Sequence, residues 1–411
     1  MTKLRKVALL LAATALSLVA PPLQAHPKKP LPDGIVSVDT LAPQVLNQRI
    51  RDRYRPEVPW AEAFGEFVDV NAYVPNLNAK EAYEFIQDIY NLEQWTISVR
   101  ELTPEGTLNG RNRYHAKEPM HPGGSIYMTE EKHPESQIVD WWVGETSDDL
   151  WMHYYVRIYD AQPLVGKPGI VINWVNFGNA KFEKDPGLMQ GFLGMRIAHA
   201  AERDNLVKIL NWRAAGNKEK VTPAIAQQLG LFDIETTAPL DIWNFVMGQV
   251  TPTVTWDNLY GQFISSHFYV PNQPVDEVWK YLKSPRNLEQ WTVSTRGVID
   301  IPGTAFMAHE TLEPRGPIFA DMRLSEGSHS LDSAALSLGY MHFFGHTEWM
   351  NSSMRVIDGL ESVGKPGSVV VWTTYHHTAY DQLPELKEYW KYLPVRNQLA
   401  AANAKLLLAQ P

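Results

Sequence analysis

The sequence contains no cysteine. Disulfide bonds, thiolate metal sites and a cysteine nucleophile are therefore excluded. Several catalytic signatures are also missing from it: Gly-x-Ser-x-Gly, a Gly-rich phosphate-binding loop, a dinucleotide-binding fingerprint and His-Glu-x-x-His. We therefore predict neither a metal site nor a cofactor.

The chain is poor in long apolar runs, and the one at its start has the features of an export signal. Lys3, Arg5 and Lys6 precede a mainly apolar run of 14 residues, 7–20, and a small residue, Ala25, follows shortly. This pattern predicts a secretory signal cleaved after Ala25, because the run is too short to span a bilayer comfortably. We expect a periplasmic or secreted protein without a stable membrane anchor.

Basic residues are outnumbered by acidic ones, 37 against 46. Cleavage after Ala25 would remove three basic residues and leave 34 − 46 = −12 as the formal net charge. Such a surface repels phosphate backbones and anionic lipids, so we expect no nucleic-acid partner.

The most informative positive feature is an internal repeat. A shift of 196 positions matches 16 of the 41 residues in 60–100, including Asn-Leu-Glu-Gln-Trp-Thr at 91–96 and 287–292. A shift of 198 matches 12 of the 36 residues in 151–186, including two Gly-Lys-Pro-Gly turns. The repeat predicts five segments: a signal peptide (1–25), an N-terminal extension (26–59), a first domain (60–215), a packed connector (216–255) and a second domain (256–411).

Each copy has the same predicted order of strands and helices. An extended run, 67–74 or 263–270, precedes a short helix, and several β-like segments follow. A strand pair then flanks the Gly-Lys-Pro-Gly turn, at 151–159 with 170–177 and at 349–357 with 368–375. A long final helix closes each copy, with one stripe in the first made by Leu188, Phe192, Met195, His199, Leu206 and Leu210. This order predicts an α+β fold with the last helix laid across a sheet.

Residues 274–291, Pro-Val-Asp-Glu-Val-Trp-Lys-Tyr-Leu-Lys-Ser-Pro-Arg-Asn-Leu-Glu-Gln-Trp, resemble the opening helix and corner of the START-like (SRPBCC) superfamily. That superfamily includes lipid-transfer domains and polyketide cyclases. The resemblance implies two tandem helix-grip domains, each a curved antiparallel sheet wrapped around a long C-terminal helix. It also implies a deep apolar cavity in this fold.

Tryptophans and histidines supply the candidate site residues. Trp60, Trp95 and their repeat partners are interpreted as packing residues, whereas Trp174 and Trp372 lie on strands next to the expected cavity. Four histidines of the second copy fall in two segments that we expect to be neighbouring strands. The predicted ligand-binding residues are Trp174, Trp372, His342, His346, His376 and Trp390.

We therefore expect the protein to bind or carry a hydrophobic small molecule, such as a lipid, a sterol-like compound or an aromatic, in at least the second cavity. The alternative is a cyclase, dehydratase or hydrolase that uses His309, His346 or His376 as general acid or base. A third interpretation is that Trp141-Trp142 and Tyr154-Tyr155 form an exposed aromatic patch that docks a partner. Matched residues such as Arg157/Arg355 and Asp160/Asp358 predict a strand-end salt bridge or turn.

Overall fold

The computed structural model describes residues 31–119, 124–232, 239–301, 305–312, 318–326, 334–342, 345–381 and 384–410. In the second sheet the side chains of 300–307, 309–310 and 313–350 are outside the described set, and these include His309, His342 and His346. The chain divides into two compact units, Met1–Gly34 and Ile35–Pro411, and both repeats lie in the second. The predicted cleavage site at Ala25 lies outside the described residues.

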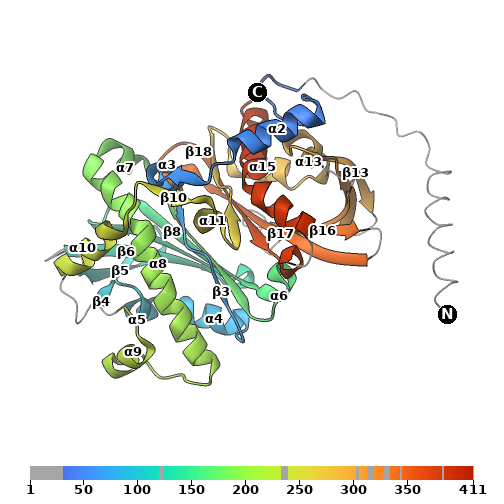
Figure 1. The fold of residues 1–411 in the computed structure, drawn as a ribbon. Helices are drawn as coiled ribbons and strands as arrows, with labels where there is room; N and C mark the ends of the chain where they lie inside the picture. Colours follow the sequence, from blue (N-terminus) through green and yellow to red (C-terminus); the bar gives the residue numbers. More distant parts are fainter. Residues whose placement is uncertain are drawn as a thin grey trace, which may run out of the picture. The chain divides into compact units, whose positions relative to one another are not determined.

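The first repeat folds as an antiparallel sheet with the strand order β2-β9-β8-β7-β6-β5-β4, and β3 also pairs with β9. The helix α8 lies across this sheet, and α4 and α5 cover part of the same core (Figure 1). Its strands and helices are β2 (Phe67–Asp69), β3 (Ala72–Val74), α4 (Ala79–Ile86), α5 (Leu92–Trp95), β4 (Arg100–Leu108), β5 (Arg111–Glu118), β6 (Gly124–His133), β7 (Ile138–Gly144), β8 (Met152–Asp160), α6 (Ala161–Val165), β9 (Ile170–Phe177), α7 (Ala180–Lys184) and α8 (Pro186–Ala214).

The second repeat has the equivalent order β11-β18-β17-β16-β15-β14-β13, with β12 also paired to β18. Its strands and helices are α11 (Trp256–Tyr260), β11 (Phe263–Ser265), β12 (Phe268–Pro271), α12 (Val275–Leu282), α13 (Leu288–Trp291), β13 (Thr295–Ile301), β14 (Ala305–Glu310), β15 (Ile318–Glu326), β16 (Ala334–His342), β17 (Gly345–Asp358), α14 (Gly359–Val363), β18 (Gly367–His376) and α15 (Pro384–Leu408). The predicted α+β fold and the tandem helix-grip layout are confirmed.

Two further segments flank the repeats. The N-terminal one contains α2 (Pro43–Arg53) and β1 (Glu57–Pro59), and the connector contains α9 (Pro223–Leu229), α10 (Pro239–Gln249) and β10 (Thr253–Thr255). The first repeat itself begins with α3 (Trp60–Phe64), the equivalent of α11. β1 pairs with β10, and Ile242 and Val246 of α10 are buried against Ala198 of α8. In the part of the chain that the structure describes, no helix has the length and apolar character needed to cross a membrane.

The shared Asn-Leu-Glu-Gln-Trp-Thr segment forms the same hydrogen-bonded corner in both repeats. The amide of Asn91 donates to the carbonyl of Phe85 at 2.8 Å, and that of Asn287 donates to Tyr281 at 2.8 Å. Glu93 accepts from the backbone of Leu102, as Glu289 does from Val298. At this corner the Asn and Glu side chains form hydrogen bonds with backbone groups that would otherwise need water. This requirement explains why the six-residue segment recurs in both repeats.

The opening extended run differs from its prediction in one respect. Residues 67–74 form two short strands, β2 and β3, although both keep one register on β9, with Asp69 opposite Val175 and Ala72 opposite Ile172. Between them the Asn71 side chain donates to Asp69 at 2.9 Å and accepts from Asn173. The break between β2 and β3 therefore lets the buried Asn71 side chain make these hydrogen bonds, while both strands stay paired with β9.

The two sheets pack against each other through β8 and β9 of the first repeat and β17, β18 and α14 of the second. Every residue of β9 is buried: Ile172 and Trp174 face the core of the first repeat, while Val175 and Phe177 contact Val369 and Val371. A strand buried on both faces explains its nearly continuous apolar sequence. The Gly-Lys-Pro-Gly turns are part of this contact, since Gly166 approaches His377 and Gly364 approaches Asn179 at the aligned position.

Candidate ligand-binding cavity

A cavity of about 570 Å³ lies in the first repeat, between the sheet and α8, with α10 contributing Trp243 and Val246 to its wall. Its remaining wall comes from α5 and residues 96–99 after it, from strands β5 to β9 with the β7–β8 connection, and from α7. This volume is in the range of sites that hold a drug-sized or cofactor-sized molecule. The cavity corresponds to the space that the helix-grip layout leaves between sheet and final helix.

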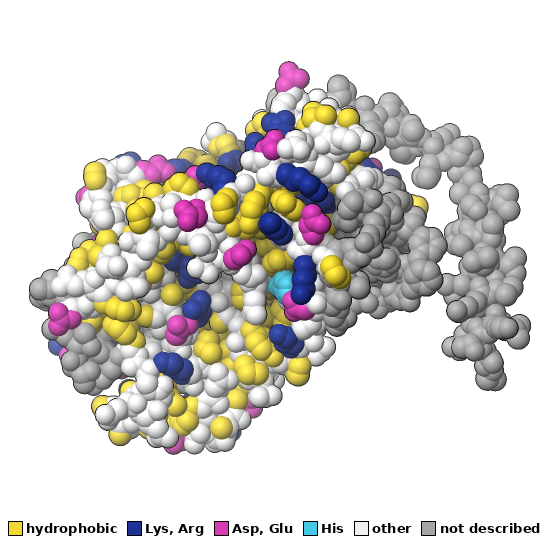
Figure 2. Space-filling model, in the orientation of Figure 1, with side chains coloured by type: hydrophobic (Ala, Val, Ile, Leu, Met, Phe, Trp, Pro, Cys, Tyr) yellow, Lys and Arg dark blue, Asp and Glu magenta, His cyan; other side chains and the backbone are white. Residues whose placement is uncertain are grey.

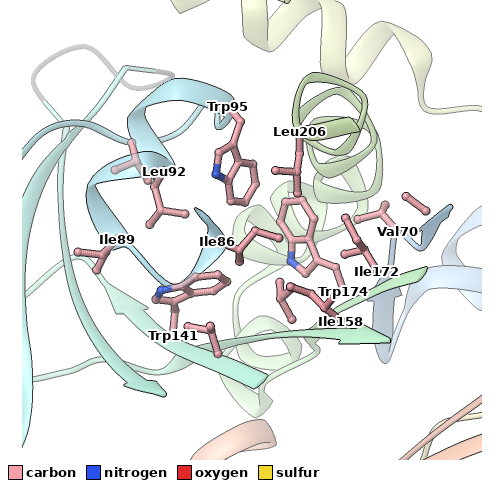
Figure 3. Packing of buried hydrophobic residues seen from close by; sticks show 14 of the residues in the cluster. Val70, Ile86, Ile89, Leu92, Trp95, Trp141, Ile158, Ile172, Trp174 and Leu206 are labelled. Carbon is pink, nitrogen blue, oxygen red and sulfur yellow. The ribbon is translucent and has the colours of Figure 1, made fainter. Parts of the chain in front are cut away.

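Three buried tryptophans dominate the inner wall. Trp95 from α5, Trp141 from β7 and Trp174 from β9 belong to one packed cluster with Ile86 of α4 (Figure 3). The rings of Trp95 and Trp174 meet edge to face at 5.3 Å. Among the described residues, none of the three indole N–H groups has a hydrogen-bond partner. The three nitrogens are buried within the packed wall, so these rings offer the cavity chiefly apolar surface.

Glycines on α8 keep the cavity open and let α10 approach. Gly187, Gly191 and Gly194 all line it, at spacings that place them along one side of the helix. A Cβ added at Gly191 would meet nothing within 4 Å, whereas one at Gly194 would lie 3.0 Å from the sulfur of Met247 on α10. A larger residue at Gly191 would fill the cavity, and one at Gly194 would push α10 away.

His199 and Glu202, one turn apart on α8, form a buried pair on the cavity wall. The Nδ1 of His199 lies 2.8 Å from Oε2 of Glu202, whose Oε1 accepts from the backbone of Ile97 at 2.7 Å and from the hydroxyl of Ser98 at 3.0 Å. Because a carboxylate only accepts, Nδ1 carries a proton, and in the neutral imidazole Nε2 is the hydrogen-bond acceptor. The nearest donor to Nε2 is the Asn176 amide, at 3.4 Å.

The rings around His199 complete this polar region. Trp174 lies 4.8 Å from the imidazole, and Tyr154 meets it edge to face at 5.5 Å. Burial, followed by the nearby charge of Glu202, raises the pKa of Tyr154, so its hydroxyl keeps its proton. That hydroxyl makes a 3.8 Å contact with the sulfur of Met152, a weak acceptor. A hydrogen-bond donor, the Tyr154 hydroxyl, and a hydrogen-bond acceptor, the His199 Nε2, therefore border the same apolar space.

The predicted site residues with described side chains are distributed over three places. Trp174 lines the cavity of the first repeat. Its counterpart Trp372 is buried and packs on Trp291 at 5.5 Å, which repeats the Trp95–Trp174 pair. His376 and Trp390 lie together instead, with their rings 4.7 Å apart and Tyr380 in contact with both. Burial lowers the pKa of His376, which borders a separate polar hollow.

The backbone places the other three histidines along the second sheet. His342 ends β16 opposite Gly345, His346 follows on β17, and His309 lies on β14, three strands from β17. His376 pairs with Met350, four residues beyond His346, which corresponds to roughly 13 Å along a strand. Their side chains lie outside the described residues, so a cavity and a catalytic role in the second repeat stay predictions.

The docking-patch interpretation is wrong. Trp141, Trp142 and Tyr155 are buried, and Tyr154 is half-buried on the cavity wall. Both β7 and β8 are buried strands, packed on one side against the core of the first repeat and on the other against the second repeat. Aromatic residues in such strands give the same sequence pattern as an exposed aromatic patch.

Sequence reasoning missed His199 and Glu202 as site residues. His199 stands in the stripe predicted for the final helix, where the pattern indicates a packing position. The available signal was its i, i+3 spacing to Glu202, a polar pair on an otherwise apolar stripe. Over the ranges that the structure describes, no group of three His, Cys, Asp or Glu residues is arranged to hold a metal ion.

No family model matches this sequence, and no curated protein matches it either. Among solved structures, it is similar to two di-domain ARO/CYC proteins. BexL, from the BE-7585A biosynthetic pathway, aligns at 10% identity over 87% of this chain and 100% of its own, with a TM-score of 0.28. StfQ, from the steffimycin pathway, aligns at 10% identity over 84% and 97%, with a TM-score of 0.26.

A single-domain structure, TTHA0849 from Thermus thermophilus, aligns at 16% identity over 37% of this chain and 99% of its own, with a TM-score of 0.27. Similarities of this size specify neither a ligand nor a reaction.

Proposed function

We propose that this protein binds an apolar, aromatic small molecule in the cavity of the first repeat, and that it does so outside the cytoplasm. The observation that carries the proposal is the 570 Å³ cavity itself, with tryptophans on its wall and a glycine, Gly191, facing its space. The first 25 residues support the location.

Aromatic character is favoured over a simple acyl chain by the composition of the wall. Flat rings can stack on or meet the edges of Trp95, Trp141 and Trp174, and such contacts contribute beyond the buried area. The pair His199–Glu202, which lines the cavity, would orient a ligand oxygen or nitrogen.

A ligand panel tests this proposal. Polycyclic aromatics, sterols and fatty acids are titrated into the full chain while tryptophan fluorescence and the unfolding temperature are followed. We expect aromatics to quench the fluorescence saturably and to raise the unfolding temperature, because a ligand that binds the folded state stabilises it. Trp174→Phe should reduce both effects. A panel that shifts neither quantity would overturn the proposal.

A second candidate function, an enzyme that transfers a proton on the bound molecule, is favoured by the geometry of His199. Its Nε2 lone pair borders the cavity while Glu202 holds the opposite nitrogen, the arrangement of a general base held by a carboxylate. Tyr154 offers a hydroxyl that can donate a hydrogen bond to the same ligand.

Comparison of the compounds extracted from the wild type and from His199→Gln separates binding from chemistry. If both carry the same compound, the site is a binding site. If the variant carries a precursor that wild-type protein converts on mixing, His199 acts in a reaction.

A further inference from the structure

The duplicated unit is longer than the two repeats, because a helix and a strand that precede each repeat are duplicated as well. α2 and β1 precede the first repeat, and α10 and β10 precede the second, with starts that differ by 239 − 43 = 253 − 57 = 196 positions. The sequence Ala-Pro stands at the start of both helices, at 42–43 and 238–239. Val36, α2 and β1 therefore form an N-terminal arm, and Phe232, α10 and β10 form an equivalent connector arm.

The helix of each arm packs against the repeat that does not follow it in the chain. Leu46 and Ile50 of α2 are buried in the core of the second repeat, whereas Ile242 and Val246 of α10 are buried against Ala198 of the first. α2 accordingly lies beside α15, and α10 beside α8 (Figure 1). The cavity of the first repeat is therefore covered by a segment that leads directly into the second repeat.

A buried asparagine on the final helix of each repeat holds the start of an arm. The side chain of Asn205 on α8 accepts from the backbone N–H of Phe232 at 2.8 Å and donates to its carbonyl at 3.1 Å. Asn403 on α15 does the same with Val36, at 2.9 and 3.0 Å. Both asparagines also donate to the tryptophan carbonyl of the shared corner. Because these hydrogen bonds are buried, they fix where each arm begins on its helix.

The two arms differ where they cross the final helix. Gly194 of α8 leaves room for Met247 of α10, whose sulfur would lie only 3.0 Å from a Cβ added at the glycine. The equivalent of Gly194 in the second repeat is Tyr392, since 194 + 198 = 392. Its ring lies 5.9 Å from the guanidinium of Arg51, which occupies the place of Met247 in α2. The connector arm can therefore approach its helix more closely than the N-terminal arm.

α10 places an aromatic side chain on the cavity that α2 lacks. Trp243 and Val246 of α10 line the cavity. The residue of α2 equivalent to Trp243 is Asn47, since 47 + 196 = 243, and both positions are half-buried. The volume left for a ligand in the first repeat therefore depends on Trp243 and on where the connector arm is held.

We propose that α10 determines which ligands the cavity accepts, with Trp243 limiting their size and Asn205 positioning the helix. This inference rests on the proposed binding of an apolar molecule in that cavity. An apolar wall discriminates between ligands mainly by size, because a side chain that fills part of the pocket excludes a larger ligand by steric overlap. Asn205 acts through α10, as a positioning residue.

The test compares the dissociation constants of 2-naphthol and of the larger 1-hydroxypyrene for the full chain, measured by quenching of tryptophan fluorescence. Both probes are uncharged at neutral pH, and Figure 2 shows basic and acidic side chains interspersed on the face that it presents. Selection by charge therefore does not enter the comparison. In Trp243→Ala the preference for hydroxypyrene over naphthol should rise at least about tenfold relative to the wild type. Trp243→Phe keeps a smaller ring and should shift the preference in the same direction by less, which covers the case in which Trp243→Ala does not fold.

Two matched variants serve as controls. Phe245→Ala removes an exposed ring from the same helix that does not line the cavity, so the preference between the probes should stay unchanged. Asn205→Ala and Asn403→Ala each remove three equivalent hydrogen bonds, so both should lower the unfolding temperature. Only Asn205→Ala should speed the dissociation of a bound probe, by roughly fivefold or more, because most changes in affinity appear in the dissociation rate.

Saturable binding with the same preference in the wild type and Trp243→Ala would overturn this inference and leave the proposed function standing. An equal rise in preference in Phe245→Ala would overturn it too, as would equal acceleration of dissociation in Asn205→Ala and Asn403→Ala. If the wild type binds neither probe nor any other aromatic compound, the proposed function fails and this inference fails with it.

Discussion

Arg355, on β17 of the second repeat, donates two hydrogen bonds of 2.9 Å to the two carboxylate oxygens of Asp140, on β7 of the first. Both side chains are buried, and His153 also contacts Asp140, with its Nε2 at 2.7 Å. In the first sheet Asp140 pairs with Tyr155 across β7 and β8. The equivalent of Tyr155 in the second repeat is Ser353, and it pairs with Ala335, so alanine takes the place of Asp140 there. The second repeat therefore offers the matched arginine, Arg157, no carboxylate at that position. The pair Asp140–Arg355 therefore joins the repeats without a matching pair at Arg157.

This asymmetry predicts unequal effects of the same substitution. Arg355→Met leaves the Asp140 carboxylate buried without its main partner and should lower the free energy of unfolding by about 3–5 kcal/mol. Arg157→Met should lower it far less, because the Nε and Nη1 of Arg157 have no hydrogen-bond partner among the described residues. Urea denaturation of the two variants measures both values. Equal losses would show that Arg355 acts through packing alone.

The same cluster predicts a pH dependence of stability. Burial lowers the pKa of His153 below its ordinary value of 6.5, although hydrogen bonding to Asp140 opposes the shift. The unfolded chain therefore takes up a proton more readily, so the contribution of His153 is complete above about pH 6.5 and is lost as pH falls toward its lower folded pKa. Burial tends to raise the pKa of Asp140, but Arg355, His153 and His133, whose Nε2 lies 3.3 Å from the carboxylate, outweigh it and hold that pKa well below 3.8. Asp140 thus contributes no slope in this window.

His153→Gln keeps a group able to hydrogen-bond to Asp140 and removes the titration. Denaturation at pH 5.0 and 7.0 should therefore show a smaller loss of stability in the variant than in the wild type, with a difference of at most about 1.4 kcal/mol per pH unit. The other histidines are common to both proteins and cancel. Identical slopes would mean that His153 titrates normally.

Glu202 should matter for stability as well as for the site. It accepts from Ile97, Ser98 and His199 while almost fully buried. Glu202→Gln replaces one accepting oxygen by a donor and should cost about 1–3 kcal/mol in unfolding free energy. Glu289→Gln, at the half-buried corner of the second repeat where Glu289 accepts from Val298, is the comparison and should cost less. A larger loss of unfolding free energy in Glu289→Gln than in Glu202→Gln would show that the buried hydrogen bonds of Glu202 contribute less to stability than those of the corner.

Much of this fold could be predicted from the sequence because its signals are local. The strand predicted at 170–177 matches β9 residue for residue. The tandem layout was predicted from the internal repeat, because segments with matching residues at a constant spacing adopt the same fold.

The position of the cavity could not be predicted in the same way. It depends on glycines of α8 and on α10, whose approach to Gly194 brings residues about 50 positions apart into contact. The larger number of histidines in the second repeat indicates a site there, whereas the cavity lies in the first repeat and is bordered by one histidine, His199, hydrogen-bonded to Glu202. The contact of Asp140 with Arg355, 215 positions away, likewise has no local signal.

The most direct test of the central claim is mass spectrometry of small molecules extracted from purified protein, compared between the wild type, Gly191→Leu and Gly248→Leu. A side chain at Gly191 enters the cavity, whereas Gly248, on α10, does not line it and also has free space around it. Both substitutions should be tolerated, since leucine favours a helix over glycine by about 0.8–1 kcal/mol. We predict that the wild type and Gly248→Leu release the same apolar aromatic compound and that Gly191→Leu releases none. Equal amounts from Gly191→Leu and the wild type would show that the cavity of the first repeat is not the ligand site.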